Sequence, residues 1–360
     1  MNRIIFRIAS LVVIFLALLV TSCAHTSTVK DPKGKTIDLE VDSLEQVSIN
    51  GSRQWIYLAG AQRENPVLLW LDGGPGGSEV AWVRRYLGPL HQSFTVVCWD
   101  QRGTAGSYRT DKDTLTVEQY VDDVIVLSDI LAKKFGQEKI FLVGHSWGSV
   151  IGLLAAQKRP DLYHAYIGAA QHINSIENDS IGWQMILDGA TCEGDEKTVS
   201  LMEKMGPPPY TKQNKDGSVV PDGDAYYEVL KRLYHYSPPA PADKGFDSMG
   251  MFLAPEHNLW SKINLVRGLV RGVKLVYPQL AFLDMEEEVQ RLECPLFLIN
   301  GRYDMTCVAS ISERWFHKVT APSKRLLWLE HSGHNGVFTE AKPFIDLLER
   351  EVRPLIDKIQ

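Results

Sequence analysis

Short apolar runs recur along the chain, and longer stretches with helical periodicity lie between them. Residues 67–71, 95–99, 139–143 and 295–300 are almost continuously apolar, as strands covered on both faces are. Residues 116–135 carry apolar side chains at helical spacing. Alternating strands and helices indicate a mostly parallel sheet flanked by helices, so we expect an α/β fold.

The two ends of this pattern differ from its middle. Residues 45–49 and 52–58 flank Asn50-Gly51 and predict a hairpin with a two-residue turn. Residues 325–329 predict the last strand, and residues 342–352 predict a closing helix.

The strand pattern breaks in the second half of the chain. Between residues 171 and 288 helical segments dominate, and proline-rich stretches at 206–209 and 237–241 interrupt them. The strand pattern then resumes. We predict a helical cap at 171–288, inserted into a core formed by residues 41–170 and 289–360.

The first residues are predicted to be a targeting segment and not part of the fold. Arg3 and Arg7 precede an apolar run over residues 8–20. This run is shorter than the about 20 residues that span a bilayer, and it suits a signal peptide. An uncleaved N-terminal anchor is the alternative.

The apolar run ends in Val20-Thr21-Ser22-Cys23, which resembles the lipobox of bacterial lipoproteins. The resemblance implies a lipoprotein signal peptide at 1–23, with Cys23 as the lipidated residue; a signal cleaved elsewhere, with Cys23 lost, is the alternative. The polar residues 24–40 are predicted to be a tether. We expect a lipid anchor in a bacterial cell envelope, at the outer membrane or facing the periplasm.

Composition narrows the possible partners. The chain is 44% hydrophobic and 23% charged, which is ordinary globular usage, and its net charge of −6 makes nucleic acid an unsuitable partner. None of the five cysteines is in C-x-x-C spacing, so no metal site is predicted. Cys98 and Cys294 lie in or beside apolar runs and are predicted to be buried thiols. A disulfide elsewhere in the chain stays open.

The most specific chemical pattern is the G-x-S-x-G motif at residues 144–148. It follows a predicted strand and precedes the small, helix-forming residues 150–156. A serine on such a turn is raised clear of the sheet, at a helix N-terminus that stabilises developing negative charge. We interpret Ser146 as a nucleophile; the alternative is a plain strand-to-helix turn.

A second glycine-rich segment, residues 72–77, follows the strand at 67–71. Its four glycines let the backbone turn sharply and approach another group closely. We interpret it as an oxyanion loop in which the Gly74 N–H points at the substrate carbonyl oxygen, and the alternative is an ordinary loop. After the next strand, Asp100 and Arg102 are expected to pair and fix a loop.

An acid and a histidine follow the last two predicted strands. Asp304 and His334 thus lie beyond the carboxyl ends of strands, where parallel sheets carry their active-site groups. With Ser146 they occur in the chain order Ser, Asp, His that α/β-hydrolases have. His331 is the rival base, and the residues up to this point leave the choice between it and His334 open.

Five motifs together carry a resemblance to a known family. They are Gly-Gly-Pro-Gly-Gly at 73–77, Asp-Gln-Arg-Gly at 100–103, Gly-His-Ser-Trp-Gly-Ser at 144–149, Gly-Arg-Tyr-Asp at 301–304 and Gly-His at 333–334. In this order they resemble the prolyl-aminopeptidase (proline iminopeptidase) family of α/β-hydrolases. The resemblance implies an α/β-hydrolase fold, a mostly parallel sheet flanked by helices with an inserted helical cap.

The same resemblance implies a set of catalytic roles. Ser146 would be the nucleophile, His334 the base and Asp304 the acid that orients it. The backbone N–H groups of Gly74 and Trp147 would form the oxyanion hole. No metal or organic cofactor is implied.

Two features depart from the family pattern. Asp72 stands where the family has histidine, which places a carboxyl group near the oxyanion loop. The cap motifs with which family aminopeptidases bind the substrate amine are not recognisable. Glu177 and Glu256 are candidates for that task, but each is interpreted first as an ordinary surface residue.

These observations predict a serine hydrolase, most directly an aminopeptidase that releases N-terminal residues, proline among them, from short peptides. A carboxylesterase or other small-acyl hydrolase with the same triad is the alternative, because one fold hosts many chemistries. A non-catalytic lipoprotein that binds a ligand in the hydrolase pocket is the third hypothesis. Dependence on a free α-amine separates the first two, and reaction with a serine-directed phosphonate tests the third.

Overall fold

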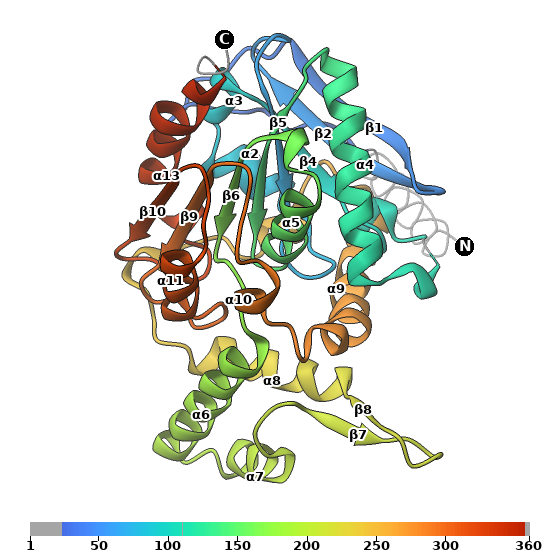
Figure 1. Cartoon of the computed structure of the whole chain (residues 1–360), viewed down its shortest axis with the longest axis vertical. Helices are drawn as coiled ribbons and strands as arrows, with labels where there is room; N and C mark the ends of the chain where they lie inside the picture. Colours follow the sequence, from blue (N-terminus) through green and yellow to red (C-terminus); the bar gives the residue numbers. More distant parts are fainter. Residues whose placement is uncertain (1–23, 110, 357–360) are drawn as a thin grey trace, which may run out of the picture.

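An eight-stranded sheet crosses the molecule in the order β1-β2-β4-β3-β5-β6-β9-β10 (Figure 1). The computed structural model describes residues 24–109 and 111–356, so the predicted signal peptide and Cys23 lie outside the described residues. The strands are β1 (Val41–Ile49), β2 (Ser52–Gly60), β3 (Val67–Leu71), β4 (Thr95–Asp100), β5 (Ile140–His145), β6 (Tyr163–Ala169), β9 (Leu296–Gly301) and β10 (Lys324–Leu329).

Pairing in the sheet is parallel from β4 to β10, and antiparallel where β1 meets β2 and β2 meets β4. The predicted hairpin is confirmed. Asn50 and Gly51 have φ angles of 45° and 75°, the positive values that a two-residue turn of this kind requires.

Helices cover both faces of the sheet because the strand side chains alternate between two apolar clusters. Leu69 and Leu71 of β3 face the cluster that contains the inner sides of α4 (Val117–Phe135) and α5 (Trp147–Lys158). The opposite face packs, together with Trp70, against α2 (Val80–Tyr86), α3 (Leu90–Ser93), α12 (Gly336–Thr339) and α13 (Ala341–Leu347). The helix α11 (Ala309–Lys318) lies beside the first cluster.

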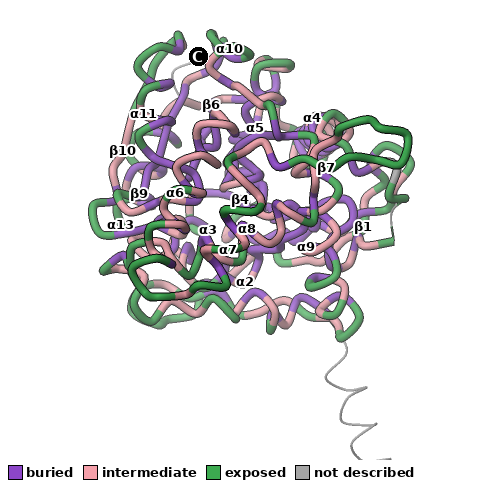
Figure 2. The backbone as a smooth tube through the Cα atoms, turned by 90° about the horizontal axis from the view of Figure 1, so that it is seen from below, coloured by how far each residue is buried: buried purple, intermediate pink, exposed green. Residues whose placement is uncertain are grey.

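The residues between β6 and β9 form the cap at the lower end of Figure 1. It contains α6 (Ser175–Glu193), α7 (Glu196–Met205), α8 (Gly223–Tyr236), α9 (Leu259–Leu280) and α10 (Met285–Glu288). A small hairpin of β7 (Thr211–Gln213) and β8 (Val219–Pro221), which the sequence pattern did not predict, projects from it. Ile186, Met202 and Tyr226 belong to a separate buried cluster that holds α6, α7 and α8 together. Figure 2, seen from the cap end, shows the buried strands behind these helices.

Short 3₁₀-helical turns and one π-helical turn connect these elements. They are Ala105–Ser107, Lys112–Thr114, Pro160–Leu162, Pro241–Asp243, Gly250–Leu253 and Arg353–Leu355, with a π-helical turn at Leu348–Val352. The π-helical turn continues α13, so the predicted closing helix is confirmed. None of the helices in the described part of the chain has the length and apolar character needed to cross a membrane.

Residues 24–40 do not form the open tether that the sequence predicts. Val29 is completely buried, and the backbone N–H of His25 donates to the Pro255 carbonyl oxygen at 3.0 Å. The buried Arg84 guanidinium donates to the Ser27 carbonyl oxygen, and its charge draws this segment onto the core. The described residues, 24–109 and 111–356, contain the whole eight-stranded sheet and its two apolar clusters, so we expect the chain from Ala24 onward to fold by itself.

The expected pairing of Asp100 with Arg102 is wrong, because each finds a partner elsewhere in the fold. Arg102 pairs with Asp123 of α4 through two contacts of 2.7 and 2.9 Å. Asp100 instead accepts from the Tyr57 hydroxyl at 2.6 Å and from the Gly106 N–H at 2.9 Å.

The expected burial of two thiols is confirmed. Cys98 and Cys294 are buried, and the four cysteines in the described residues are free thiols.

We predict that Asp123→Ala lowers the free energy of unfolding by about 3–5 kcal/mol, because it leaves the buried Arg102 guanidinium without its countercharge. The measurement is urea unfolding followed by circular dichroism. Asp129→Ala is the matched control on the same helix. Its partner Lys133 is 75% exposed, so the loss should stay below about 1 kcal/mol. Equal losses in the two variants would contradict the prediction.

Candidate active site

Ser146 lies on a strained turn between β5 and α5. Its φ of 55° and ψ of −120° are unusual for a residue with a side chain, and such strain is kept only where the surroundings impose it. Two glycines make the turn possible. A Cβ at Gly144 would lie 2.4 Å from the Gly148 carbonyl oxygen, and one at Gly148 would lie 2.1 Å from the Leu71 carbonyl oxygen. Only glycine therefore lets α5 pack this closely against β3.

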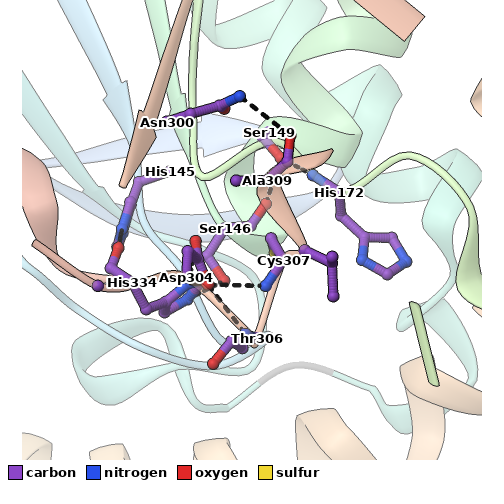
Figure 3. Close-up of polar contacts among 12 residues, drawn as sticks. His145, Ser146, Ser149, His172, Asn300, Asp304, Thr306, Cys307, Ala309 and His334 are labelled. Atoms are coloured by element: carbon purple, nitrogen blue, oxygen red, sulfur yellow. Dashed lines mark hydrogen bonds and ion pairs between the residues drawn. The ribbon is translucent and has the colours of Figure 1, made fainter. Parts of the chain in front are cut away.

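Ser146, His334 and Asp304 form one hydrogen-bonded chain (Figure 3). The Ser146 Oγ lies 2.9 Å from His334 Nε2, and His334 Nδ1 lies 3.0 Å from Asp304 Oδ2. The sequence had placed each of them beyond a strand, and the structure brings all three together. His331 is exposed and is not in this chain.

The Asp304 carboxylate is held in place by the turn that follows β9. Its Oδ1 accepts from the backbone N–H groups of Thr306 and Cys307, each at 2.9 Å, and its side chain is 1% exposed. A fixed carboxylate on Nδ1 keeps the second histidine nitrogen, Nε2, free to accept the serine proton. The arrangement can therefore generate a serine nucleophile.

The glycine-rich loop at residues 72–77 lies directly against Ser146. A Cβ at Gly73 would be 3.2 Å from the Ser146 Cβ, and Gly74 lines the same pocket. Trp147 is the first residue of α5, so its N–H lies at the positive end of that helix. Within the part of the chain that the structure describes, neither the Gly74 N–H nor the Trp147 N–H donates a hydrogen bond. Both donors are available to an oxygen atom bound above Ser146.

Gln101 connects these two loops, a role that the sequence gave no reason to expect. Its side-chain N–H donates to the Asp72 carbonyl oxygen at 2.9 Å, and its carbonyl oxygen accepts from the Trp147 indole at 2.8 Å. The motif after β4 thus fixes the glycine-rich loop relative to the turn that carries Ser146.

Glu79 is the second polar residue that the sequence analysis missed. Its Oε1 accepts from the Gly73 N–H at 3.1 Å and lies 2.7 Å from His145 Nδ1, and its Oε2 accepts from the Trp70 indole at 2.7 Å. His145 Nε2 donates in turn to the His334 carbonyl oxygen at 3.1 Å. The Glu79 carboxylate therefore links the glycine-rich loop to His145, and through His145 to the loop that carries His334. No motif signals this role, because it arises from three separate segments.

The contact with Glu79 favours the charged form of the His145 imidazole. Burial by itself lowers the pKa of His145, but the adjacent Glu79 carboxylate and its hydrogen bond outweigh burial, so the pKa lies above its ordinary value of 6.5. An imidazolium can donate from both nitrogens, as the two contacts of His145 require.

Asp72 does not bring the unfavourable charge that its position suggested. Burial, together with the nearby carboxyl groups of Glu79 and Asp100, raises the pKa of Asp72 well above its ordinary value of 3.8. These surroundings favour the uncharged acid. The change from the family histidine therefore leaves the oxyanion loop without a strong negative charge beside it.

A cavity of about 780 Å³ lies over Ser146, between the core and the cap. Its walls are mostly apolar side chains from α8, α9 and the segment before α9, among them Leu230, Met251, Phe252, Leu269 and Val270. Of the described residues that line it, Glu79 is the one acid, and both of its oxygens already accept N–H groups. No group of His, Cys, Asp or Glu in the described residues is suited to hold a metal ion.

The two glutamates considered for binding an amine do not line this cavity. Glu177 forms a double contact with Arg314 at the surface, at 2.8 and 2.5 Å. Glu256 is buried and accepts from the Ser27 N–H at 2.8 Å, next to Arg84. Each is committed to a structural ion pair.

Comparison with known proteins agrees with this architecture. The crystal structure of proline iminopeptidase from Mycobacterium smegmatis superposes with a TM-score of 0.58 at 13% identity, over 88% of this chain and 100% of that one. The chain has the α/β-hydrolase fold.

Sequence comparison finds hydrolases with more specific names among the proteins similar to this chain. Residues 90–187 match the family model described as serine aminopeptidase, S33. The probable aminopeptidase YbaC of Bacillus subtilis (strain 168) is 28% identical over 328 residues, which cover 89% of this chain and 98% of that protein. The putative carbamate hydrolase RutD of Stutzerimonas stutzeri (strain A1501) is 24% identical over 291 residues, 81% of this chain and 93% of that one. The relatives are thus hydrolases of more than one substrate class.

We predict that Glu79→Gln destabilises the protein most at acidic to neutral pH. Because the folded-state pKa of His145 is raised, the stabilisation is fully present below about pH 6.5 and is lost as the pH rises through the folded-state value. The variant should lose about 3 kcal/mol of unfolding free energy at pH 6 and less at pH 9. Urea unfolding at both pH values measures this.

Glu193→Gln is the control for the buried pair, since Glu193 contacts His235 at the surface with both side chains more than half exposed. It should change stability little at either pH. A loss in Glu79→Gln that stays constant or grows with pH would contradict the prediction.

Proposed function

We propose that this protein is a serine hydrolase that transfers an apolar acyl group to water through an acyl-enzyme. The hydrogen-bonded chain from Ser146 through His334 to Asp304, at the floor of the apolar cavity, carries the proposal. Such a constellation is recognised by its geometry and not by its position in a sequence. It also argues against a protein that only binds a ligand.

The reaction follows from the positions of these groups. His334 Nε2 accepts the Ser146 proton as Oγ attacks the substrate carbonyl carbon, and the carbonyl oxygen becomes an oxyanion. The N–H groups of Gly74 and Trp147 stabilise that oxyanion, each by about 3 kcal/mol. The imidazolium then donates its proton to the leaving group, which departs and leaves the acyl ester on Ser146. Water, deprotonated by His334, attacks this ester, and Ser146 recovers its proton as the acid leaves.

The cavity favours a neutral acyl part over a charged one. A buried ammonium group requires a carboxylate partner, because its desolvation is otherwise strongly unfavourable. Glu79 is the one acid among the described lining residues, and it is already bonded to three N–H groups. A carboxylic ester with an apolar acyl chain is therefore the substrate class that the cavity fits best.

An aminopeptidase acting on short peptides is the second candidate. It is favoured by the likeness to YbaC, named a probable aminopeptidase, over nearly the full length of both chains. In that case Glu79, the one acid among the described residues that line the cavity, would receive the substrate amine.

The test uses the chain from Ala24 onward, an apolar acyl ester, and leucyl and prolyl amides with free and with acetylated amines. We expect ester hydrolysis, and we expect Ser146→Ala to lower kcat by about 10⁶-fold because the nucleophile is lost. Ser180→Ala is the control: its hydroxyl donates within α6 to the Ile176 carbonyl oxygen, and activity should be retained.

Each other outcome of this test selects another hypothesis. Cleavage of the free-amine amides alone would replace the esterase proposal with the aminopeptidase. No turnover of any substrate, and no reaction with a serine-directed phosphonate, would leave the non-catalytic lipoprotein.

A further inference from the structure

The helix α9 carries one apolar stripe that begins on the surface and ends in the cavity. Leu259, Ile263 and Val266 are 42%, 41% and 52% exposed. Val270 and Val273 continue the same stripe and line the cavity over Ser146. The spacing of four and three residues puts all five on one face of the helix. The stripe thus connects solvent to the cavity.

Other exposed apolar side chains surround the outer end of this stripe. Trp260 is 71% exposed, and Leu253 and Met249, in the segment just before α9, are 69% and 58% exposed. Met249 and Val266 line the same cavity, so these two side chains lie at its rim. We call Met249, Leu253, Leu259, Trp260, Ile263 and Val266 the apolar ridge. Contiguous exposed apolar surface of this kind marks an interaction site.

The charge of α9 identifies the kind of partner. The helix contains Lys262 and Arg267 beside the ridge but no acidic residue, although the whole chain has a net charge of −6. Of its other cations, Lys274 already pairs with Asp224 of α8 at 2.6 Å, so the charge beside the ridge comes from Lys262 and Arg267. Lys262 and Arg267 alternate with the ridge residues along the helix. A helix that is apolar on one face, basic beside it and provided with tryptophan is typical of binding at an anionic bilayer surface.

The start of the described chain lies at the same place. The N–H of His25 donates to Pro255, and the N–H of Ser27 donates to Glu256, two residues of the segment between Leu253 and α9. The sequence just before residue 24 contains the apolar run 8–20 and Cys23. A membrane attachment through those residues would therefore hold the segment beside Leu253 and the start of α9 near the bilayer.

We propose that the apolar ridge docks on an anionic lipid bilayer, and that the apolar substrate enters the cavity from that bilayer along α9. The docking rests on the ridge, its cations and the position of residue 25. The entry of substrate rests in addition on the proposed acyl hydrolase function.

Vesicle flotation tests the docking without reference to activity. The protein is the chain from Ala24 onward with Ser146→Ala, so that neither a lipid anchor nor hydrolysis contributes. We expect it to float with vesicles of phosphatidylcholine and phosphatidylglycerol. The ridge variant Leu253→Ser/Trp260→Ser/Ile263→Ser should lower the partition coefficient at least about tenfold, because three apolar side chains no longer enter the bilayer.

Two further variants separate a ridge effect from a general one. Val219→Ser/Phe282→Ser removes side chains that are 66% and 67% exposed outside the ridge, and it should float like the parent protein. Lys262→Glu/Arg267→Glu should weaken binding to vesicles that contain phosphatidylglycerol at least about fivefold. Absence of flotation by the parent protein, or equal losses in the ridge and control variants, would overturn the docking proposal.

Self-association provides a further decisive outcome. Light scattering that shows a dimer of the parent protein, dissolved by the ridge substitutions, would make the ridge an interface between two copies and overturn the proposal.

Activity then tests the route of entry with Ser146 intact. The ridge variant should hydrolyse a short, soluble ester at the parent rate and a long-chain ester in vesicles at least about tenfold more slowly. Equal rates on the vesicle ester would overturn entry from the membrane. If neither protein cleaves either ester, the acyl hydrolase proposal fails, and flotation still decides the docking.

Discussion

The close approach of α5 to the end of β3 is the constraint on which the candidate site depends. With Gly148 against the Leu71 carbonyl oxygen and Gly144 against Gly148, the turn between them is forced into the backbone conformation of Ser146. This position brings Ser146 to the loop after β3 and to the histidine after β10. Any side chain at these glycines would separate the sheet from the helix and move the serine away from both.

Hydrogen bonds between distant segments also fix the loops around Ser146. The Glu79 carboxylate joins the oxyanion loop to His145, and His145 holds the backbone of His334. Gln101 joins the backbone of Asp72 to the indole of Trp147 in a similar way. The loops therefore keep their relative positions through buried side chains rather than through the sheet, and they can be rigid without being regular.

The sheet, the helices α4 and α5 and the hairpin could be predicted from the sequence, because each depends on a local pattern. The positions of Ser146, Asp304 and His334 could be predicted because each follows the end of a strand. Glu79 and Gln101 could not be predicted, since their partners come from segments far apart in the chain. The same reason explains the wrong pairing of Arg102, whose partner Asp123 lies on α4. Residues 24–40 have the composition of a linker, but the buried charge of Arg84 binds them to the core. The catalytic roles themselves stay proposals.

The packed N-terminal segment limits how an anchored molecule could move. If a lipid is attached at Cys23, Ala24 is the one residue between the anchor and the hydrogen bond of His25 to Pro255. A connection of one residue is too short to act as a flexible spacer. The protein would be held with one face permanently turned toward the lipid. Its search for substrate would become two-dimensional, confined to molecules that diffuse in or along the same leaflet.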